Sequence, residues 1–280
     1  MALPSQFLPA AFSLSAVFVW GTSDFLGGYA SRRSNAFVFT TVVHLSGLLL
    51  MFGVAAAGHS PFPARTGVWW ALAAGASGGA GLAIFYRALA SGRMGLTAPV
   101  AAVLSAAIPT VFGMFTEGVP RPLQIAGFVL AASGIWLISR PEDGSRPQGI
   151  GTAVFAGICF AGYYLFIKQA GNESAVWLSA ISRIASFALT GTIVVLARNY
   201  QITREGVGIA VVAGILDISG SVMFVRAAQT GRLDAAVFIS SLYPAITVLL
   251  ARLFLKEHFT HWKAVGMFAA LLAVPLIAMR

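Results

Sequence analysis

Four ionisable side chains lie inside long apolar stretches of the sequence: Asp24, His44, Arg183 and Asp217. A charge in the hydrocarbon core of a bilayer is costly, so each of these positions is a candidate for substrate binding or ion coupling. A carboxylate can bind an ammonium group or exchange a proton, and a guanidinium can bind a carboxylate. Histidine changes charge near neutral pH, which suits proton coupling.

Arg183 and Asp217 lie at similar distances from the polar connector that separates their two apolar segments. Arg183 is 14 residues from it and Asp217 is 11 residues from it. At the rise of an α-helix this difference in depth is about 5 Å, which an arginine side chain can span. Two interpretations stay open. The residues form a buried ion pair that holds two helices together, or they meet the carboxylate and ammonium groups of an amino-acid-like substrate.

Asp24 and His44 also have a structural and a functional interpretation. Asp24 lies about one turn from the expected end of its helix, so it is either an interfacial carboxylate near Arg32 and Arg33 or a coupling group. His44 is either an interhelical hydrogen-bonding residue or a proton-coupling group.

Small and aromatic residues supply further candidates for a binding site. In the stretch GASGGAGLA, Gly75 and Gly79 are spaced for close helix packing, while Ser77 and Gly78 could face a cavity. The stretch lacks the G-x-G-x-x-G pattern of a nucleotide-binding loop. The interior aromatic residues could line an apolar pocket or pack against helices and lipid: Trp20, Tyr86, Tyr163, Tyr164 and Tyr243.

These residues must be positioned by membrane helices. Of 280 residues, 58% are hydrophobic and 10% charged, whereas a soluble domain carries about a quarter charged residues. The net charge of +9 is spread singly or in pairs between apolar runs, which argues against nucleic-acid binding. The sequence predicts an all-α polytopic protein with ten transmembrane helices, near residues 8–28, 35–57, 68–90, 96–116, 122–139, 149–169, 175–197, 206–228, 234–255 and 261–279. The first run lacks a preceding basic residue, so we expect a membrane helix there rather than a cleaved signal peptide.

No cofactor or metal is expected. The single cysteine, Cys159, lies in an apolar run and cannot form an intramolecular disulfide. The stretch EHFTH at residues 257–261 lacks the H-E-x-x-H order of a zinc protease.

The sequence also repeats itself at an offset of 139 residues. Tyr86-Arg87-Ala88 and Gly92-Arg93 correspond to Val225-Arg226-Ala227 and Gly231-Arg232, and His44, Gly75, Gly81 and Gly127 correspond to Arg183, Gly214, Gly220 and Gly266. We therefore expect two five-helix repeats, residues 1–140 and 141–280. Because five is odd, corresponding helices cross the membrane in opposite directions, as in secondary transporters with a binding site near the midplane between the repeats.

This pattern resembles the drug/metabolite transporter superfamily, and in particular its EamA-type members. The motifs that carry the resemblance are Trp20-Gly21, Tyr86-Arg87-Ala88-Leu89, Pro109 followed by Glu117 and Gln124-Ile125-Ala126-Gly127, and in the second half Pro244, Leu255-Lys256-Glu257 and Val265-Gly266. Pro109 and Pro244 are not at equivalent positions, so the kinks that they cause need not be symmetric. The resemblance implies a multi-pass protein of the bacterial inner membrane that exports amino acids or other small metabolites, with toxic cations as an alternative cargo.

The expected mechanism is alternating access around a midplane cavity, with protons as a candidate coupling ion and a facilitator without coupling as an alternative. Besides the substrate and the lipid bilayer no partner is required, and the sequence is compatible with a monomer. An intramembrane enzyme would need a convergent set of catalytic groups, and only His44 and Asp24 approach one. We therefore expect a transporter and not an enzyme.

Overall fold

The computed structural model describes residues 7–90, 94–116, 118–139, 150–255 and 260–278, and within these ranges the chain contains helices and no strand. The helices are α1 (Phe7–Ala30), α2 (Ala36–Ala57), α3 (Arg65–Ala90), α4 (Met94–Thr116), α5 (Pro122–Ser139), α6 (Ile150–Gln169), α7 (Ala175–Ala197), α8 (Arg204–Thr230), α9 (Leu233–Ser240), α10 (Tyr243–Leu255) and α11 (His261–Ala278).

Local sequence signals set several helix ends. The Asn35 side chain accepts hydrogen bonds from the backbone N–H groups of Phe37 and Val38, which caps α2. Ser174 caps α7 and Thr203 caps α8 in the same way. These caps satisfy backbone donors that would otherwise have no partner at a helix start, so the apolar runs begin where polar residues precede them.

One helix that was predicted to be continuous is interrupted in the structure. The segment expected over residues 234–255 is divided into α9 and α10, which meet at Ser241 and Leu242. Pro244 explains the break, because it has no N–H to donate to the carbonyl of Ser240 and its ring would clash with that carbonyl. Pro244 instead occupies the first turn of α10, where a proline is tolerated. Helix α4 continues through Pro109, so the two prolines do act differently.

Several helices meet the requirements for crossing a bilayer. Among the described residues, four single helices and the stretch that covers α9 and α10 are long and apolar enough to span a membrane: Ala36–Ala57, Arg65–Ala88, Ala175–Ala197, Arg204–Thr230 and Leu233–Phe254. The total of ten membrane spans stays a prediction.

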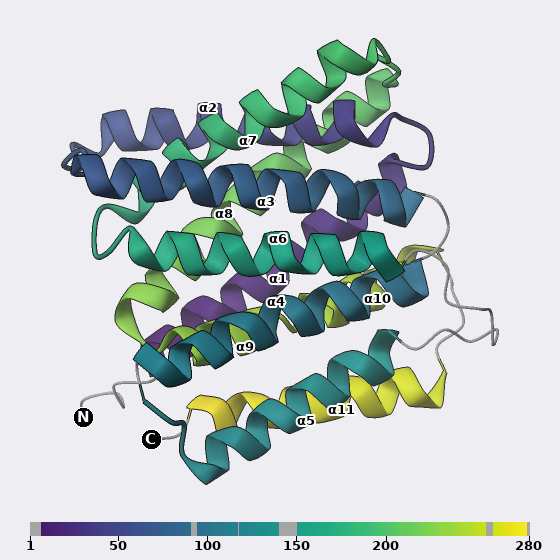
Figure 1. Cartoon of the computed structure of the whole chain (residues 1–280). Coiled ribbons are helices and arrows are strands. Elements are labelled where there is room, and N and C mark those ends of the chain that lie inside the picture. Colours follow the sequence, from purple (N-terminus) through teal and green to yellow (C-terminus); the bar gives the residue numbers. More distant parts are fainter. Residues whose placement is uncertain (1–6, 91–93, 117, 140–149, 256–259, 279–280) are drawn as a thin grey trace.

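The helices form a bundle in which the two halves of the chain are interleaved (Figure 1). Helix α1 packs on α8, and its counterpart α6 packs on α3. Helix α2 contacts α7 and α8, and α7 contacts α2 and α3. Helices α5 and α11 pack on each other at one edge of the bundle (Figure 1). The contacts therefore come in matched pairs. The contact of α1 with α8 corresponds to that of α6 with α3, and the contact of α2 with α8 corresponds to that of α7 with α3.

Two close helix contacts show the same correspondence between the halves at single residues. A Cβ atom added at Gly75 would collide with the backbone carbonyl of Ser182, and one added at Gly214 would collide with the backbone carbonyl of Val43. The two glycines are 139 positions apart, and so are Val43 and Ser182. The close packing predicted for the glycine-rich stretch is thus present between α3 and α7, and between α8 and α2.

Helices α2 and α7 pack against each other in opposite directions. Phe52 lies edge-to-face on Trp177, with ring centroids 5.7 Å apart, and His44 contacts Arg183 further along both helices. Residue numbers that fall along α2 therefore rise along α7. Two helices that correspond in sequence run antiparallel in space.

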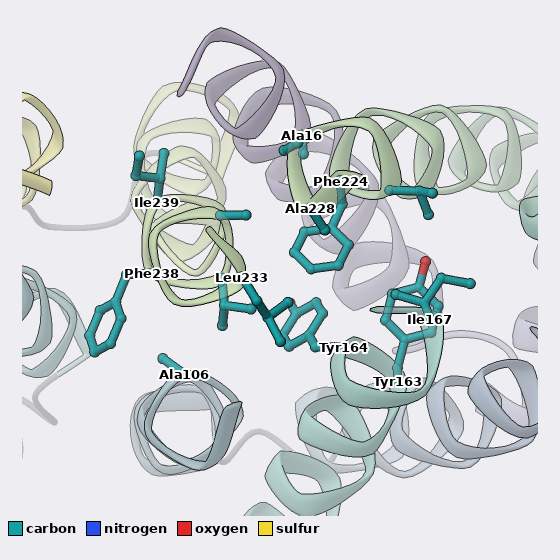
Figure 2. Close-up of a cluster of buried hydrophobic side chains, with 14 of the residues drawn as sticks. Ala16, Ala106, Tyr163, Tyr164, Ile167, Phe224, Ala228, Leu233, Phe238 and Ile239 are labelled. Atoms are coloured by element: carbon teal, nitrogen blue, oxygen red, sulfur yellow. The ribbon is translucent and has the colours of Figure 1, made fainter. Parts of the chain in front are cut away.

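An aromatic core fills the space beside α8 and α9. Phe224 packs on Tyr164 with ring centroids 4.6 Å apart, and Tyr163 is the adjacent residue of α6 (Figure 2). Phe128 of α5 stacks on Phe238 of α9 at 4.3 Å. All eight residues of α9 are buried, so this short helix is enclosed by its neighbours.

Candidate functional site

A cavity lies inside the bundle, and residues of both halves form its walls. Helices α1, α3, α6, α7, α8 and α10 contribute the lining residues Trp20, Asp24, Gly78, Leu82, Phe160, Tyr163, Tyr164, Arg183, Asp217, Ser221 and Tyr243. Both chain halves are therefore needed to build it. Its lining combines three ionisable side chains with five aromatic side chains.

The predicted ion pair between Arg183 and Asp217 is present. Nη2 of Arg183 lies 2.6 Å from Oδ2 of Asp217, and the two side chains are 7% and 12% exposed. The same nitrogen donates to Oγ of Ser221 at 2.8 Å. The backbone carbonyl of Asp217 accepts hydrogen bonds from Oγ of Ser221 and from Nε1 of Trp20, both at 3.0 Å. These contacts fix the ion pair to α8 and to α1.

His44 holds the other side of the Arg183 guanidinium. Nη1 of Arg183 lies 3.2 Å from Nδ1 of His44, and His44 is completely buried. Since a guanidinium only donates, Nδ1 must be the acceptor, and the imidazole is neutral with its proton on Nε2. Nε2 has no hydrogen-bond partner within the described parts of the chain. His44 lies behind the cavity wall and contacts Arg183 rather than the cavity.

Asp24 is buried in the cavity wall. Helix α1 continues to Ala30, which places Asp24 more than one turn from its end. Asp24 is 9% exposed, and its Oδ1 accepts a hydrogen bond from the Tyr86 hydroxyl at 3.2 Å. Among the described residues no lysine or arginine forms an ion pair with Asp24. The cavity therefore contains one compensated carboxylate and one uncompensated one.

Tyr86 and Ser77, two further predicted residues, lie next to the cavity without lining it. The Tyr86 hydroxyl supports Asp24 from behind, and its ring packs against Gly27, where a Cβ atom would have no room. Ser77 turns away from the cavity and donates to the backbone carbonyl of Cys159 at 2.8 Å. The other seven predicted site residues, His44 excepted, line the cavity: Trp20, Asp24, Gly78, Tyr163, Arg183, Asp217 and Tyr243.

Three lining residues were missed by the sequence reasoning: Leu82, Phe160 and Ser221. Helical spacing contains the signal that would have found Leu82 and Ser221, and the repeat offset contains the one for Phe160. Leu82 and Ser221 are 139 positions apart, and each lies one helical turn after another lining residue, Gly78 or Asp217. Phe160 corresponds to Trp20 at an offset of 140.

Metal binding finds no support in the described residues, where histidine, cysteine and acidic side chains form no cluster of three. Glu257 and His258 of the EHFTH stretch, the motif residues Glu117 and Lys256, and the midpoint connector at 140–149 lie outside the described residues.

Apolar helices around a buried cavity with ionisable side chains are typical of a multi-pass membrane transporter. The model of the EamA-like transporter family matches residues 8–140 and again residues 147–279. The chain therefore belongs to the EamA-like transporter family, and it is a transporter of small molecules and not an enzyme.

Two further comparisons show proteins to which the chain is similar. An uncharacterised protein of Methanocaldococcus jannaschii is 27% identical over 132 residues, which are 45% of this chain and 96% of that protein. That relative has about the length of one repeat. A solved crystal structure superposes with a TM-score of 0.80 over 96% of this chain and 97% of its own, at 16% identity, which supports the fold alone.

Proposed function

We propose that this protein exports amino acids or related small amphipathic metabolites across the bacterial inner membrane, using the cavity between its two repeats. The observation that carries the proposal is the group of buried charges in that cavity, where the Arg183–Asp217 pair lies beside the uncompensated carboxylate of Asp24. Family membership makes the protein a transporter, and these charges suggest the cargo.

The charges of the cavity suit a zwitterion. A substrate carboxylate would bind the guanidinium of Arg183, and a substrate ammonium group would bind Asp217 or Asp24. Breaking the internal ion pair leaves two buried charges without partners, which is unfavourable unless both are paired again. A molecule with both charges satisfies this condition, and a lone anion does not.

The proposed mechanism is alternating access between inverted repeats. Support comes from the antiparallel packing of α2 and α7 and from the matched contacts of Gly75 and Gly214. If the two repeats rock against each other about this contact, the cavity opens to one side of the membrane and then to the other. The break between α9 and α10 lies beside the lining residue Tyr243 and gives this wall a further point at which it can bend.

Protons are the proposed coupling ion, and Asp24 is the proposed site of coupling. Asp24 has no cation beside it in the described structure, so it can bind either a proton or the ammonium group of the substrate, but not both at once. Asp217 is held by Arg183, and His44 lies outside the cavity, so these two residues are second and third candidates. A facilitator that binds its substrate without a coupling ion is the alternative.

Export of organic cations is the second candidate function. The observation that favours it is the position of Asp24 in a cavity with Trp20, Tyr164 and Tyr243, because aromatic faces attract cations that lie close to them. A cation would need Asp24 alone and would leave the Arg183–Asp217 pair intact.

Transport by reconstituted protein tests the proposal. Purified protein in liposomes is given labelled amino acids or labelled organic cations, with and without a pH gradient. Amino-acid flux that the gradient accelerates supports proton-coupled amino-acid export, and flux that ignores the gradient supports a facilitator. Flux of cations alone supports the second candidate, and flux of neither class contradicts both.

A further inference from the structure

The cavity has two walls that correspond to each other in the repeat but differ in chemistry. Helices α1 and α8, which pack together, contribute Trp20, Asp24, Asp217 and Ser221. Helices α6 and α3, which also pack together, contribute Phe160, Tyr164, Gly78 and Leu82.

Each residue of the first wall has a counterpart in the second. At an offset of 140, Trp20 corresponds to Phe160 and Asp24 corresponds to Tyr164. At an offset of 139, Gly78 corresponds to Asp217 and Leu82 corresponds to Ser221. Contacts that adjacent residues of these helices make are related by the same two offsets.

Glycine contacts support this alignment of the two walls independently. A Cβ atom at Gly81 would meet Cys159 and Phe160, whereas one at Gly220 would meet Val19 and Trp20. The same close contact therefore occurs on both sides of the cavity.

Every ionisable carboxylate of the α1/α8 wall is replaced by an uncharged residue on the α3/α6 wall. The position that corresponds to Asp24 holds Tyr164, the one that corresponds to Asp217 holds Gly78, and the one that corresponds to Ser221 holds Leu82. Arg183 also belongs to the charged wall, because its guanidinium is bonded to Asp217 and Ser221. The cavity is thus charged on one side and apolar or aromatic on the other.

Building on the proposed function, we propose that the cavity orients its substrate and selects for an uncharged, apolar side chain. The ammonium and carboxylate groups lie against the α1/α8 wall, and the side chain lies against the α3/α6 wall. A charged side chain, as in glutamate or lysine, would be desolvated on a wall that offers no counter-ion.

Leu82 and Gly78 set the size of the side chain that fits. Leu82 is 6% exposed and lines the cavity one turn beyond Gly78, so a shorter side chain there enlarges the cavity on its apolar side. A Cβ atom at Gly78 would lie 3.1 Å from the ring of Tyr163, so a larger residue there would displace this ring, which lines the cavity. These are specificity-determining residues, and Ser221 and Arg183 bind the charged groups that all amino acids share.

The test compares labelled leucine, phenylalanine, glutamate and lysine as probes in proteoliposomes. For the native protein we expect the ratio of maximal transport rate to KM to be about a hundredfold higher for leucine and phenylalanine than for glutamate and lysine. Leu82→Ala should raise the ratio of phenylalanine to leucine by about tenfold. Ser221→Ala should lower the uptake of both and leave their ratio unchanged.

Leu72→Ala is the matched control, because it makes the same change in α3 at a residue that does not line the cavity. It should leave the ranking of the four probes unchanged. If Leu82→Ala does not yield folded protein, Leu82→Val makes a smaller enlargement of the same wall and should change the ratio in the same direction.

The outcomes separate this inference from the proposed function. Comparable uptake of glutamate or lysine, or an equal effect of Leu82→Ala on every probe, overturns the inference and leaves amino-acid export standing. Uptake of none of the four probes overturns the inference and counts against amino-acid export as well.

Discussion

His44 and Arg183 occupy corresponding positions of the two repeats, 139 residues apart, and their side chains touch at 3.2 Å. Corresponding residues meet only where they lie next to the axis that relates the two halves. The contact therefore places this axis next to the His44 and Arg183 side chains. Because one partner is a neutral imidazole and the other a guanidinium, the two corresponding positions form a hydrogen bond instead of repelling each other.

The role of His44 can be separated from proton coupling by substitution. His44→Leu removes the acceptor for Nη1 of Arg183, and we expect the KM for a transported amino acid to rise about ten- to hundredfold, as a lost hydrogen bond to a charged group costs about 1.5–3 kcal/mol. His44→Gln keeps an acceptor and should preserve most of the affinity. Equal effects of the two substitutions, measured in proteoliposomes, would contradict a positioning role.

Asp217 should be required for transport more than for folding. Asp217→Asn keeps the shape of the side chain but leaves the Arg183 guanidinium without a counter-ion, so we expect uptake to fall at least tenfold, while the amount of protein in the membrane changes little. Glu205→Gln is the control, since Glu205 is an exposed acid at the start of the same helix. Unchanged flux in Asp217→Asn would exclude Asp217 from substrate binding.

Asp24 should determine the response to a pH gradient. Asp24→Asn cannot exchange a proton, so its uptake of a transported amino acid should be the same with and without the gradient. Tyr86→Phe removes the hydrogen bond to Asp24 but keeps the carboxylate, and it should retain the response. A gradient response that survives in Asp24→Asn would move the coupling site to Asp217 or His44.

The two glycine contacts should be equally important for stability. Gly75→Val and Gly214→Val each force a side chain into a backbone carbonyl of the opposing helix, and each should destabilise the protein by about 1–3 kcal/mol or more. Gly53→Val is the control, because a Cβ atom at Gly53 meets nothing within 4 Å. Thermal unfolding in detergent measures all three. A large effect of only one of the two contact glycines would argue that the repeats are not packed equivalently.

Much of this architecture was predictable because apolar runs and polar caps determine helix ends directly. The division of α9 from α10 was not predicted, since a proline in an apolar run can either kink a membrane helix or begin a new one. The end of the first helix was predicted two residues early, because α1 extends beyond Gly28 to Ala30.

The site itself was predictable in part. Depth counting along the helices brought Arg183 and Asp217 together, because both helices start from the same short connector. It gave no information about which face of each helix points inward, so Ser77 was included and Ser221 was missed. The repeat offset supplies part of that information, because Trp20 lines the cavity and identifies its counterpart Phe160 in the other repeat.

Alternating access requires that the cavity between the repeats be reached from both sides of the membrane. The most direct test replaces the only cysteine, Cys159→Ala, and introduces Leu82→Cys on the apolar wall. A membrane-impermeant thiol reagent is then added to one side or the other of sealed vesicles. We expect modification from each side, slowed by a transported amino acid. Modification from one side only, whatever the substrate or gradient, would contradict the account.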